Sequence, residues 1–200
     1  MIRKQISFQY ILIFFVIQFQ CSYSQPSTYT SSYGLPVLPG VTGFGLDTKG
    51  GMDGKIIRVT NLNKKGKGSL LEAIEYDGPR IIVFEVAGVI DLERSSLEIV
   101  NPFVTIAGQT APFPGITIIQ GGIRIKTNDV IIQHIKVRPG EAGQEKKSGW
   151  ESDGISTSGG AYNVIIDHCT LTWATDENLT AGGPRFHGRN VNEWRKNTSH

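Results

Sequence analysis

The chain repeats a strand-sized unit. Asp-Val-Ile-Ile-Gln-His-Ile-Lys-Val at 129–137 aligns without a gap with Asn-Val-Ile-Ile-Asp-His-Cys-Thr-Leu at 163–171, and Phe-Val-Thr-Ile-Ala-Gly-Gln-Thr at 103–110 is a weaker third copy. Val104 precedes Val130 by 26 residues, and Val130 precedes Val164 by 34. Strand-sized units that recur at about 20 to 35 residues predict a solenoid, in which each turn buries its apolar side chains against the next.

Short β-branched runs, broken by Gly, Asn, Asp and Pro, dominate the sequence from residue 80 onward. The expected strands lie at 55–60, 81–86, 89–92, 97–100, 104–106, 116–119, 123–126, 130–132 and 164–166. No Asn-Gly or Asp-Gly turn joins neighbouring strands, as a tight hairpin would require. We therefore predict an all-β fold, a right-handed parallel β-helix, over residues 41–200.

One short helix is expected at residues 69–75. Ser69 is placed to cap its first turn, and Glu72 follows three residues later, at the spacing of a capping box. Leu70, Leu71 and Ile74 fall on one side of this helix. We expect the helix to cover the apolar end of the first solenoid turn.

The first 24 residues have the pattern of a signal peptide. Arg3 and Lys4 precede an apolar run at 11–17, and small residues precede a cleavage point before Gln25. The run is too short for a helix that spans a bilayer, which needs about 20 apolar residues. We expect a secreted protein with no membrane anchor after cleavage, and a loose entry segment at 25–40.

Two glycine clusters follow, in Gly43-Phe-Gly45 and Gly50-Gly51-Met-Asp-Gly54. They lack the spacing of a phosphate-binding loop and do not open a helix, so we interpret them as turn residues.

Charge and cysteine content bound the class of protein. Cleavage after residue 24 leaves 18 Lys and Arg against 18 Asp and Glu. A nearly neutral chain does not favour bulk electrostatic binding of nucleic acid. Cys21 leaves with the leader, so Cys169 has no partner for an intrachain disulfide. The stability of a secreted chain then rests on its core or on a metal.

Four acidic residues gather around the last repeat: Glu151, Asp153, Asp176 and Glu177. Glu151 and Asp153 point the same way from an extended segment, and Asp176 lies one turn further, where parallel strands stack at about 4.8 Å. Such carboxylates repel each other unless a cation lies among them, and Ca²⁺ takes roughly six to eight oxygen ligands. The alternative is a set of solvated turn residues or ion-pair partners, and both interpretations stay open.

Two histidines occupy equivalent positions in the repeats. His134 and His168 are therefore expected to stack, with Asp167 as a local partner. No set of His and Cys residues has the ligand spacing of a zinc site.

Basic and aromatic side chains have two interpretations each. Lys126, Lys136 and Arg138 either line a groove for an acidic polymer or form the solvent side of two strands. Trp150 and Trp173 either stack on sugar rings or pack within the fold. A polar loop is expected near 139–150, where the second repeat interval exceeds the first, and such insertions often lie on the binding side of a solenoid.

Five strings of residues carry a family resemblance. They are Gly43-Phe-Gly45, Val59-Thr-Asn-Leu62 with Gly68-Ser-Leu70, Gly78-Pro-Arg-Ile-Ile-Val-Phe84, Thr105-Ile-Ala-Gly-Gln-Thr-Ala-Pro112, and Val164-Ile-Ile-Asp-His-Cys169 with Trp173-Ala-Thr-Asp-Glu177. Over about residues 37–200 the chain resembles family 1 polysaccharide lyases of the pectate lyase type. The fourth string and the Ile-Asp-His-Cys string are the specific ones.

The resemblance implies a calcium-dependent enzyme that cleaves polygalacturonate by β-elimination to 4,5-unsaturated oligogalacturonides. In that family calcium bridges protein carboxylates and the uronate of the substrate, and an arginine removes the C5 proton. Asp153 matches the acidic calcium ligand before the Ile-Asp-His strand, Glu151 its acidic neighbour, and Asp176 the first ligand of the following turn. We expect an acidic polysaccharide, polygalacturonate or pectin, as the partner of a monomer.

The chain departs from the family pattern in two ways. Four residues after Asp176 the family often has a second carboxylate, whereas this chain has Thr180. Glu177 is the candidate substitute, although adjacent strand residues face opposite ways. No residue matches the family's catalytic arginine, which lies in later coils. Because the pattern stops at His200 without a cap, we expect the N-terminal portion of a longer protein, and we expect residues 25–200 alone to be inactive.

Two other functions stay open. A polygalacturonase-type glycoside hydrolase is also a β-helix, and Gly122-Ile-Arg-Ile-Lys126 resembles its Arg-Ile-Lys element. Here, however, that element precedes the candidate aspartates instead of following them, and hydrolysis needs a general acid and a base-water pair of carboxylates. A noncatalytic pectin-binding β-helix also stays open, because no catalytic base is identified.

Overall fold

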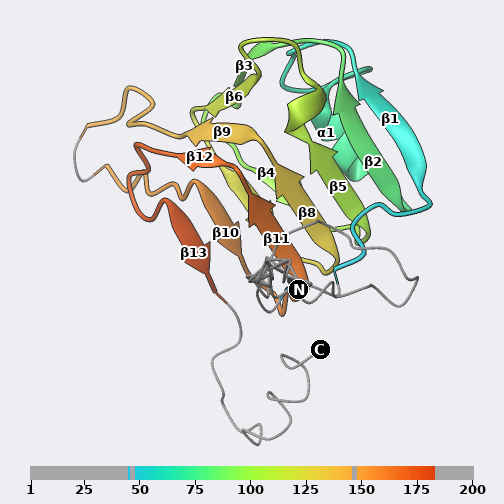
Figure 1. Cartoon of the computed structure of the whole chain (residues 1–200). Helices are drawn as coiled ribbons and strands as arrows, with labels where there is room; N and C mark the ends of the chain where they lie inside the picture. Colours follow the sequence, from blue (N-terminus) through green and yellow to red (C-terminus); the bar gives the residue numbers. More distant parts are fainter. Residues whose placement is uncertain (1–44, 46–47, 146–147, 183–200) are drawn as a thin grey trace, which may run out of the picture.

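Three parallel sheets wind around one apolar core (Figure 1). The computed structural model describes residues 45, 48–145 and 148–182, so the predicted signal peptide and entry segment lie outside the described residues. Sheet A contains β1 (Lys55–Val59), β2 (Arg80–Phe84), β5 (Val104–Ala107), β8 (Val130–Gln133) and β11 (Val164–Asp167). Sheet B contains β3 (Gly88–Asp91), β6 (Ile116–Ile119), β9 (Ile135–Arg138) and β12 (Thr170–Leu171). Sheet C contains β4 (Leu97–Ile99), β7 (Ile123–Ile125), β10 (Ile155–Thr157) and β13 (Leu179–Ala181).

From β2 onward the chain visits sheets A, B and C in turn, so each circuit is one coil of a parallel β-helix. All of the described strand pairings are parallel. The right-handed sense that we predict is the one that strand twist favours for parallel crossovers. The predicted parallel β-helix is confirmed.

The observed register is the one that the repeats predict. Val104 pairs with Val130, and Val130 pairs with Val164, in neighbouring strands of sheet A. Further along the same repeats, Lys136 pairs with Thr170 in sheet B. The gapless alignment of the two strong copies is therefore their alignment in space.

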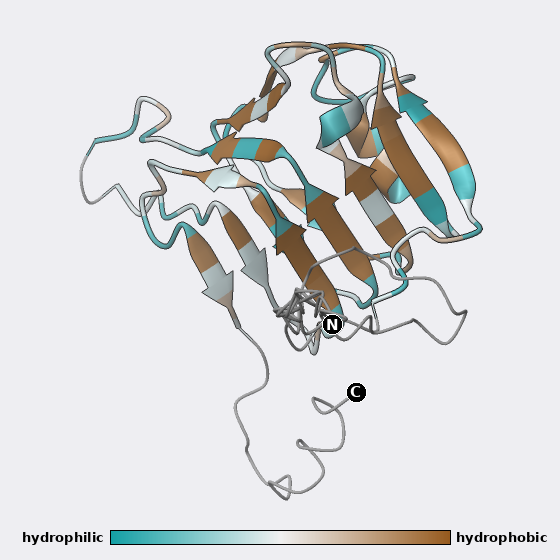
Figure 2. Ribbon diagram, viewed as in Figure 1, coloured by the Kyte–Doolittle hydropathy of each residue, from teal (hydrophilic) through white to brown (hydrophobic). Residues whose placement is uncertain are grey.

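The core consists of stacked β-branched side chains. Ile82, Ile106 and Ile132 follow one another in register and are at most 1 % exposed. Figure 2 shows the strands as predominantly hydrophobic and the connecting turns as more polar. Because a parallel ladder superimposes equivalent residues, each inward Ile or Val packs on its counterpart in the next coil.

Four strands were not among those expected from the sequence, namely β9, β10, β12 and β13. They are short, from two to four residues, and polar side chains alternate with their few apolar ones. Their positions depend on pairing with the preceding coil, as between Ile155 and Ile123. A single-strand pattern of this length does not reveal such pairing.

The predicted capping helix is α1 (Leu70–Glu75). The Ser69 hydroxyl accepts a hydrogen bond from the Glu72 backbone N–H at 3.2 Å, as a capping box requires. The Glu72 carboxylate reaches one residue further back than expected and accepts from the Gly68 N–H at 2.6 Å. Leu70 and Ile74 of α1 are buried in the core, at the end of the β-helix that β1 and β2 form. Of the described helices, none is long and apolar enough to cross a membrane.

The segment at 48–54 lies against the outer face of sheet A. The Lys49 N–H donates to the Asp129 carboxylate at 2.9 Å, and the Gly51 N–H donates to the Thr105 hydroxyl at 2.9 Å. A Cβ on Gly51 would clash with the carbonyl oxygen of Arg80. Our interpretation of these glycines as turn residues is therefore incomplete, because Gly51 is required for close approach to a strand.

Candidate metal centre

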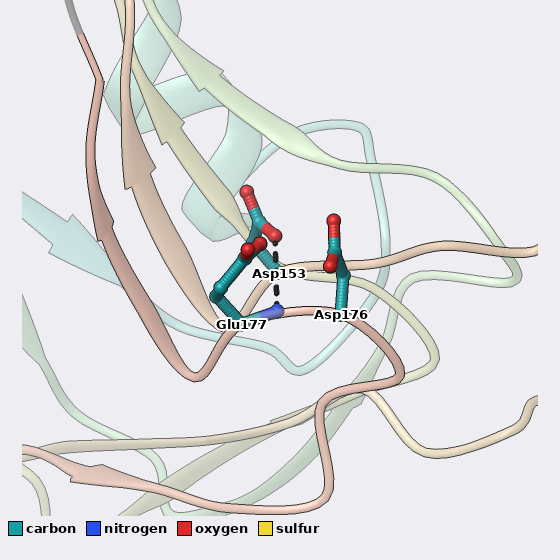
Figure 3. A group of neighbouring side chains, drawn as sticks. All are labelled: Asp153, Asp176 and Glu177. Carbon is teal, nitrogen blue, oxygen red and sulfur yellow. Dashed lines mark hydrogen bonds between the residues drawn. The ribbon is translucent and has the colours of Figure 1, made fainter.

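Three carboxylates meet where β10 and β13 begin. Asp153 lies two residues before β10, and Asp176 and Glu177 lie in the turn before β13. Each offers one oxygen within 4.8 Å of the oxygens of the other two. Figure 3 shows the three side chains projecting from the two adjacent turns. Asp153 is partly buried, whereas Asp176 and Glu177 are exposed.

The ladder of sheet C brings these two turns together. The Gly154 N–H donates to the carbonyl of Glu177 at 3.0 Å, which continues the pairing of Ile155 with Leu179 beyond the strand ends. The Glu177 N–H in turn lies 3.4 Å from a carboxylate oxygen of Asp153. A Cβ on Gly154 would clash with the carbonyl of Asn178, so a glycine is needed for this spacing.

The neighbouring carboxyls of the cluster disfavour the ionised form of Glu177. The pKa of the exposed Glu177 carboxyl is raised, first by the hydrogen bond and charge of Asp176 and then by partial desolvation and by Asp153. Three carboxylates in one place favour a hard divalent cation, and calcium prefers carboxylate oxygens. The donor set therefore fits calcium.

The structure unites three of the four predicted ligands. Asp153, Asp176 and Glu177 form the group, and Glu151 is not part of it. Glu151 lines a depression below the 140–151 loop instead. Glu177 lies with Asp176, as its candidacy as a substitute ligand requires, because both lie in a turn where the alternation of a strand does not apply. The Thr180 hydroxyl lies 3.5 Å from the Glu177 carboxylate, to which it donates.

The predicted histidine stack is present. The rings of His134 and His168 lie 4.9 Å apart with an interplanar angle of 14°. Asp167 accepts from His168 Nδ1 at 2.7 Å and from the Gln133 amide at 3.0 Å. The hydrogen bond from Gln133, followed by that from His168, lowers the pKa of the Asp167 carboxyl. Asp167 is thus the local partner that the sequence predicts.

The basic residues do not line a single groove. Lys126 directly follows β7 of sheet C and pairs with Glu98 at 2.8 Å, whereas Lys136 lies in β9 of sheet B and donates to the Pro114 carbonyl at 2.9 Å. The Arg138 guanidinium lies 5.3 Å from the centre of the Trp173 ring. The sequence analysis considered Arg124 only within the Arg-Ile-Lys element and not among these basic residues, although the alternation Ile-Arg-Ile indicates that it points outward from sheet C.

The two tryptophans differ in their surroundings. The Trp150 indole N–H donates to the Gly140 carbonyl at 3.0 Å, so this ring is held by the fold. Trp173 is 69 % exposed. Both contribute to the depression under the 140–151 loop. Stacking of Trp173 on a sugar ring stays a prediction.

Comparison with known proteins shows which proteins this chain is similar to. No protein-family profile matches the chain. The chain is 40 % identical over 154 residues to the probable pectate lyase C of Emericella nidulans, covering 76 % of this chain and 34 % of that protein. It is 33 % identical over 153 residues to the probable pectate lyase 5 of Arabidopsis thaliana, covering 67 % of this chain and 36 % of that protein. The chain thus spans about a third of the length of the curated relatives it matches.

The crystal structure of Jun a 1, the major allergen from cedar pollen, has a similar fold. The TM-score is 0.58 at 22 % sequence identity, and the match covers 72 % of this chain and 46 % of the allergen. The parallel sheets and the carboxylate cluster define a parallel β-helix with a candidate metal centre. The sequence matches show, further, that the chain is a relative of the pectate lyases.

Proposed function

We propose that this protein is a calcium-dependent polysaccharide lyase that cleaves polygalacturonate by β-elimination and releases 4,5-unsaturated oligogalacturonides. The observation that carries the proposal is the convergence of Asp153, Asp176 and Glu177 from two adjacent coils. The similarity of the chain to proteins named probable pectate lyases supports it.

The protein residues have a simple role in this proposal. Asp153, Asp176 and Glu177 would hold the cation, and a uronate carboxylate of the substrate would bind beside them. Bound calcium withdraws charge from the uronate and makes its C5 proton more acidic. Thr180 keeps Glu177 in place through its hydroxyl and adds no further negative charge.

The partner and the location follow from the same proposal. An acidic polysaccharide, polygalacturonate or pectin, is the substrate, and nucleic acid is not a partner. The leader at 1–24 directs export, and the protein acts outside the cell as a monomer. The near balance of 20 basic and 18 acidic residues in the whole chain is in keeping with a binding site built locally rather than from bulk charge.

The first test is the ultraviolet absorbance of polygalacturonate mixed with the full-length protein. Absorbance that rises with calcium and stops with excess chelator is expected, because elimination creates a conjugated double bond. New reducing ends without that absorbance would indicate a hydrolase. Calcium-dependent binding without product would indicate a noncatalytic binding protein.

The second test addresses the metal centre directly. The substitutions D153N and D176N are each expected to weaken calcium binding at least about tenfold, because affinity follows the number of charged ligands. Calorimetry with calcium, or luminescence with terbium, measures this without any activity. E75Q is the matched control, because Glu75 is an exposed carboxylate at the end of α1. Calcium affinities equal to that of the unsubstituted protein would contradict the assignment.

A further inference from the structure

Arg124 points outward from the middle of β7. Both of its neighbours in the strand are buried, whereas its own side chain is 47 % exposed. The register aligns Arg124 with Glu98 of β4 on one side and with Ser156 of β10 on the other, and Thr180 of β13 follows Ser156. These four residues form a column across the outer face of sheet C, which we call the sheet C column.

Around Glu98, at the β4–β7 side of the sheet C column, positive charge exceeds negative charge. Glu98 lies 2.8 Å from Lys126 Nζ and 3.6 Å from Arg124 Nη1, so one carboxylate faces two cations. Lys126 makes the hydrogen bond with Glu98, and this bond is the main reason why the pKa of the Glu98 carboxyl is lowered. The Arg124 contact is longer than an ordinary hydrogen bond. Its guanidinium therefore keeps donors for a further anion.

The candidate metal centre contacts the sheet C column through Thr180. The hydroxyl of Thr180 donates to the Glu177 carboxylate at 3.5 Å, which ties the acidic cluster to this face of the sheet. Two strand steps separate Thr180 from Arg124, or about 10 Å at the usual spacing of about 4.8 Å. Between them lies Ser156, which is only 7 % exposed. The sheet thus carries a candidate cation site at the turns before β10 and β13 and an exposed cation at Arg124, with the uncharged, buried Ser156 between Arg124 and Thr180.

We propose that Arg124, supported by Lys126, binds a uronate carboxylate of the acidic polysaccharide in a subsite on β7, one strand from β10 and two strands from β13. This inference rests on the proposed function. A guanidinium suits the role, because its parallel N–H groups pair with both oxygens of a carboxylate. The polymer then runs across the strands of sheet C, with one uronate at the metal centre and another at Arg124.

The test uses the full-length protein with saturating calcium and oligogalacturonates of increasing length. The measured quantity is KM, or the dissociation constant if the protein binds without cleaving. R124Q is expected to raise this value about tenfold for long oligomers, since one charge-assisted interaction is lost. The shortest oligomers, kcat and the calcium affinity should be unchanged. Because the ion pair of Arg124 with Glu98 is exposed, the substitution is expected to leave the fold intact.

Three further variants sharpen the test. R124K keeps the charge but loses the planar fork, so an intermediate effect is expected. E98Q removes the competing carboxylate and should tighten the binding of long oligomers. K136Q is the control, because Lys136 is a cation of sheet B.

Two results would overturn the inference. One is an R124Q protein that binds long oligomers as well as the unsubstituted protein does. The other is an R124Q effect of the same size at every length, which would place Arg124 at the metal centre itself. An unsubstituted protein that binds no polygalacturonate overturns the proposed function, and this inference with it.

Discussion

At the scale of single residues, glycines set the distance between coils at the metal centre. A Cβ on Gly122 would clash with the carbonyl of Asp153, and a Cβ on Gly154 would clash with the carbonyl of Asn178. Neither glycine has a positive φ, so backbone conformation does not explain them. Their role is to let the turn that carries Asp153 lie directly on its two neighbours.

We therefore predict that G154A weakens the metal centre without changing any ligand. The added methyl group pushes the turn of Asp176 and Glu177 away from Asp153, so calcium affinity should fall at least about tenfold. The free energy of unfolding should fall by about 1–3 kcal/mol, as for overpacked sites. Calorimetry and urea denaturation measure the two effects.

The control is G66A. Gly66 has a φ of 97° and no atom within 4 Å of an added Cβ. It should lose roughly 1 kcal/mol of stability through backbone strain and keep its calcium affinity. Equal calcium affinities in G154A and the unsubstituted protein would refute the spacing role.

At the scale of elements, Arg80 joins the capping helix to the first coils. This side chain is fully buried, and burial lowers the pKa of its guanidinium while Asp77 opposes the change. Its N–H groups donate to five carbonyls, those of Ala73, Ile74, Gly78, Asn101 and Pro102. Two of these carbonyls belong to α1, whose last carbonyls have no partner within the helix.

R80M should therefore cost about 3 kcal/mol or more of the free energy of unfolding, because several buried carbonyls lose their donor at once. The matched control is R58M, since Arg58 pairs with Glu85 on the surface and its side chain is 68 % exposed. Its loss should stay below about 1 kcal/mol. Urea denaturation compares the two variants. Losses of similar size would show that Arg80 does not hold the helix in place.

At the scale of the whole molecule, the metal centre connects successive coils of a solenoid. Its candidate ligands come from the turns before β10 and β13. In these two strands Ile155 pairs with Leu179, which lies 24 residues later in the sequence. A cation held by both turns binds the folded state and not the unfolded chain. Calcium should consequently stabilise the fold as well as the site.

The expected gain in stability is about 2.7 kcal/mol at a calcium concentration 100 times the dissociation constant. Thermal unfolding of the full-length protein with calcium and with chelator measures it through a rise in Tm. D153N should show little or no rise, whereas E75Q should respond like the unsubstituted protein. A Tm that ignores calcium in the unsubstituted protein would argue against a site shared by two coils.

The sequence by itself determined the architecture and the register. The repeats around Val104, Val130 and Val164 align in space as they align in sequence, because parallel strands superimpose equivalent residues and bury every second side chain. The cap at Ser69 was equally readable, since it depends on residues within one helical turn. The spacing of the repeats was sufficient to predict the strand register, and the residues of one helical turn were sufficient to predict the cap.

Only the tertiary structure decided which side chains meet. Glu177 joins Asp153 and Asp176, whereas Glu151 does not, because turn geometry, and not strand alternation, directs these carboxylates. Likewise Lys126 follows a strand of sheet C whereas Lys136 lies in sheet B, and Arg124 is the exposed cation in the middle of β7. The physical reason is that convergence depends on how neighbouring coils stack and on how each turn bends, and neither is encoded in the period of a single strand.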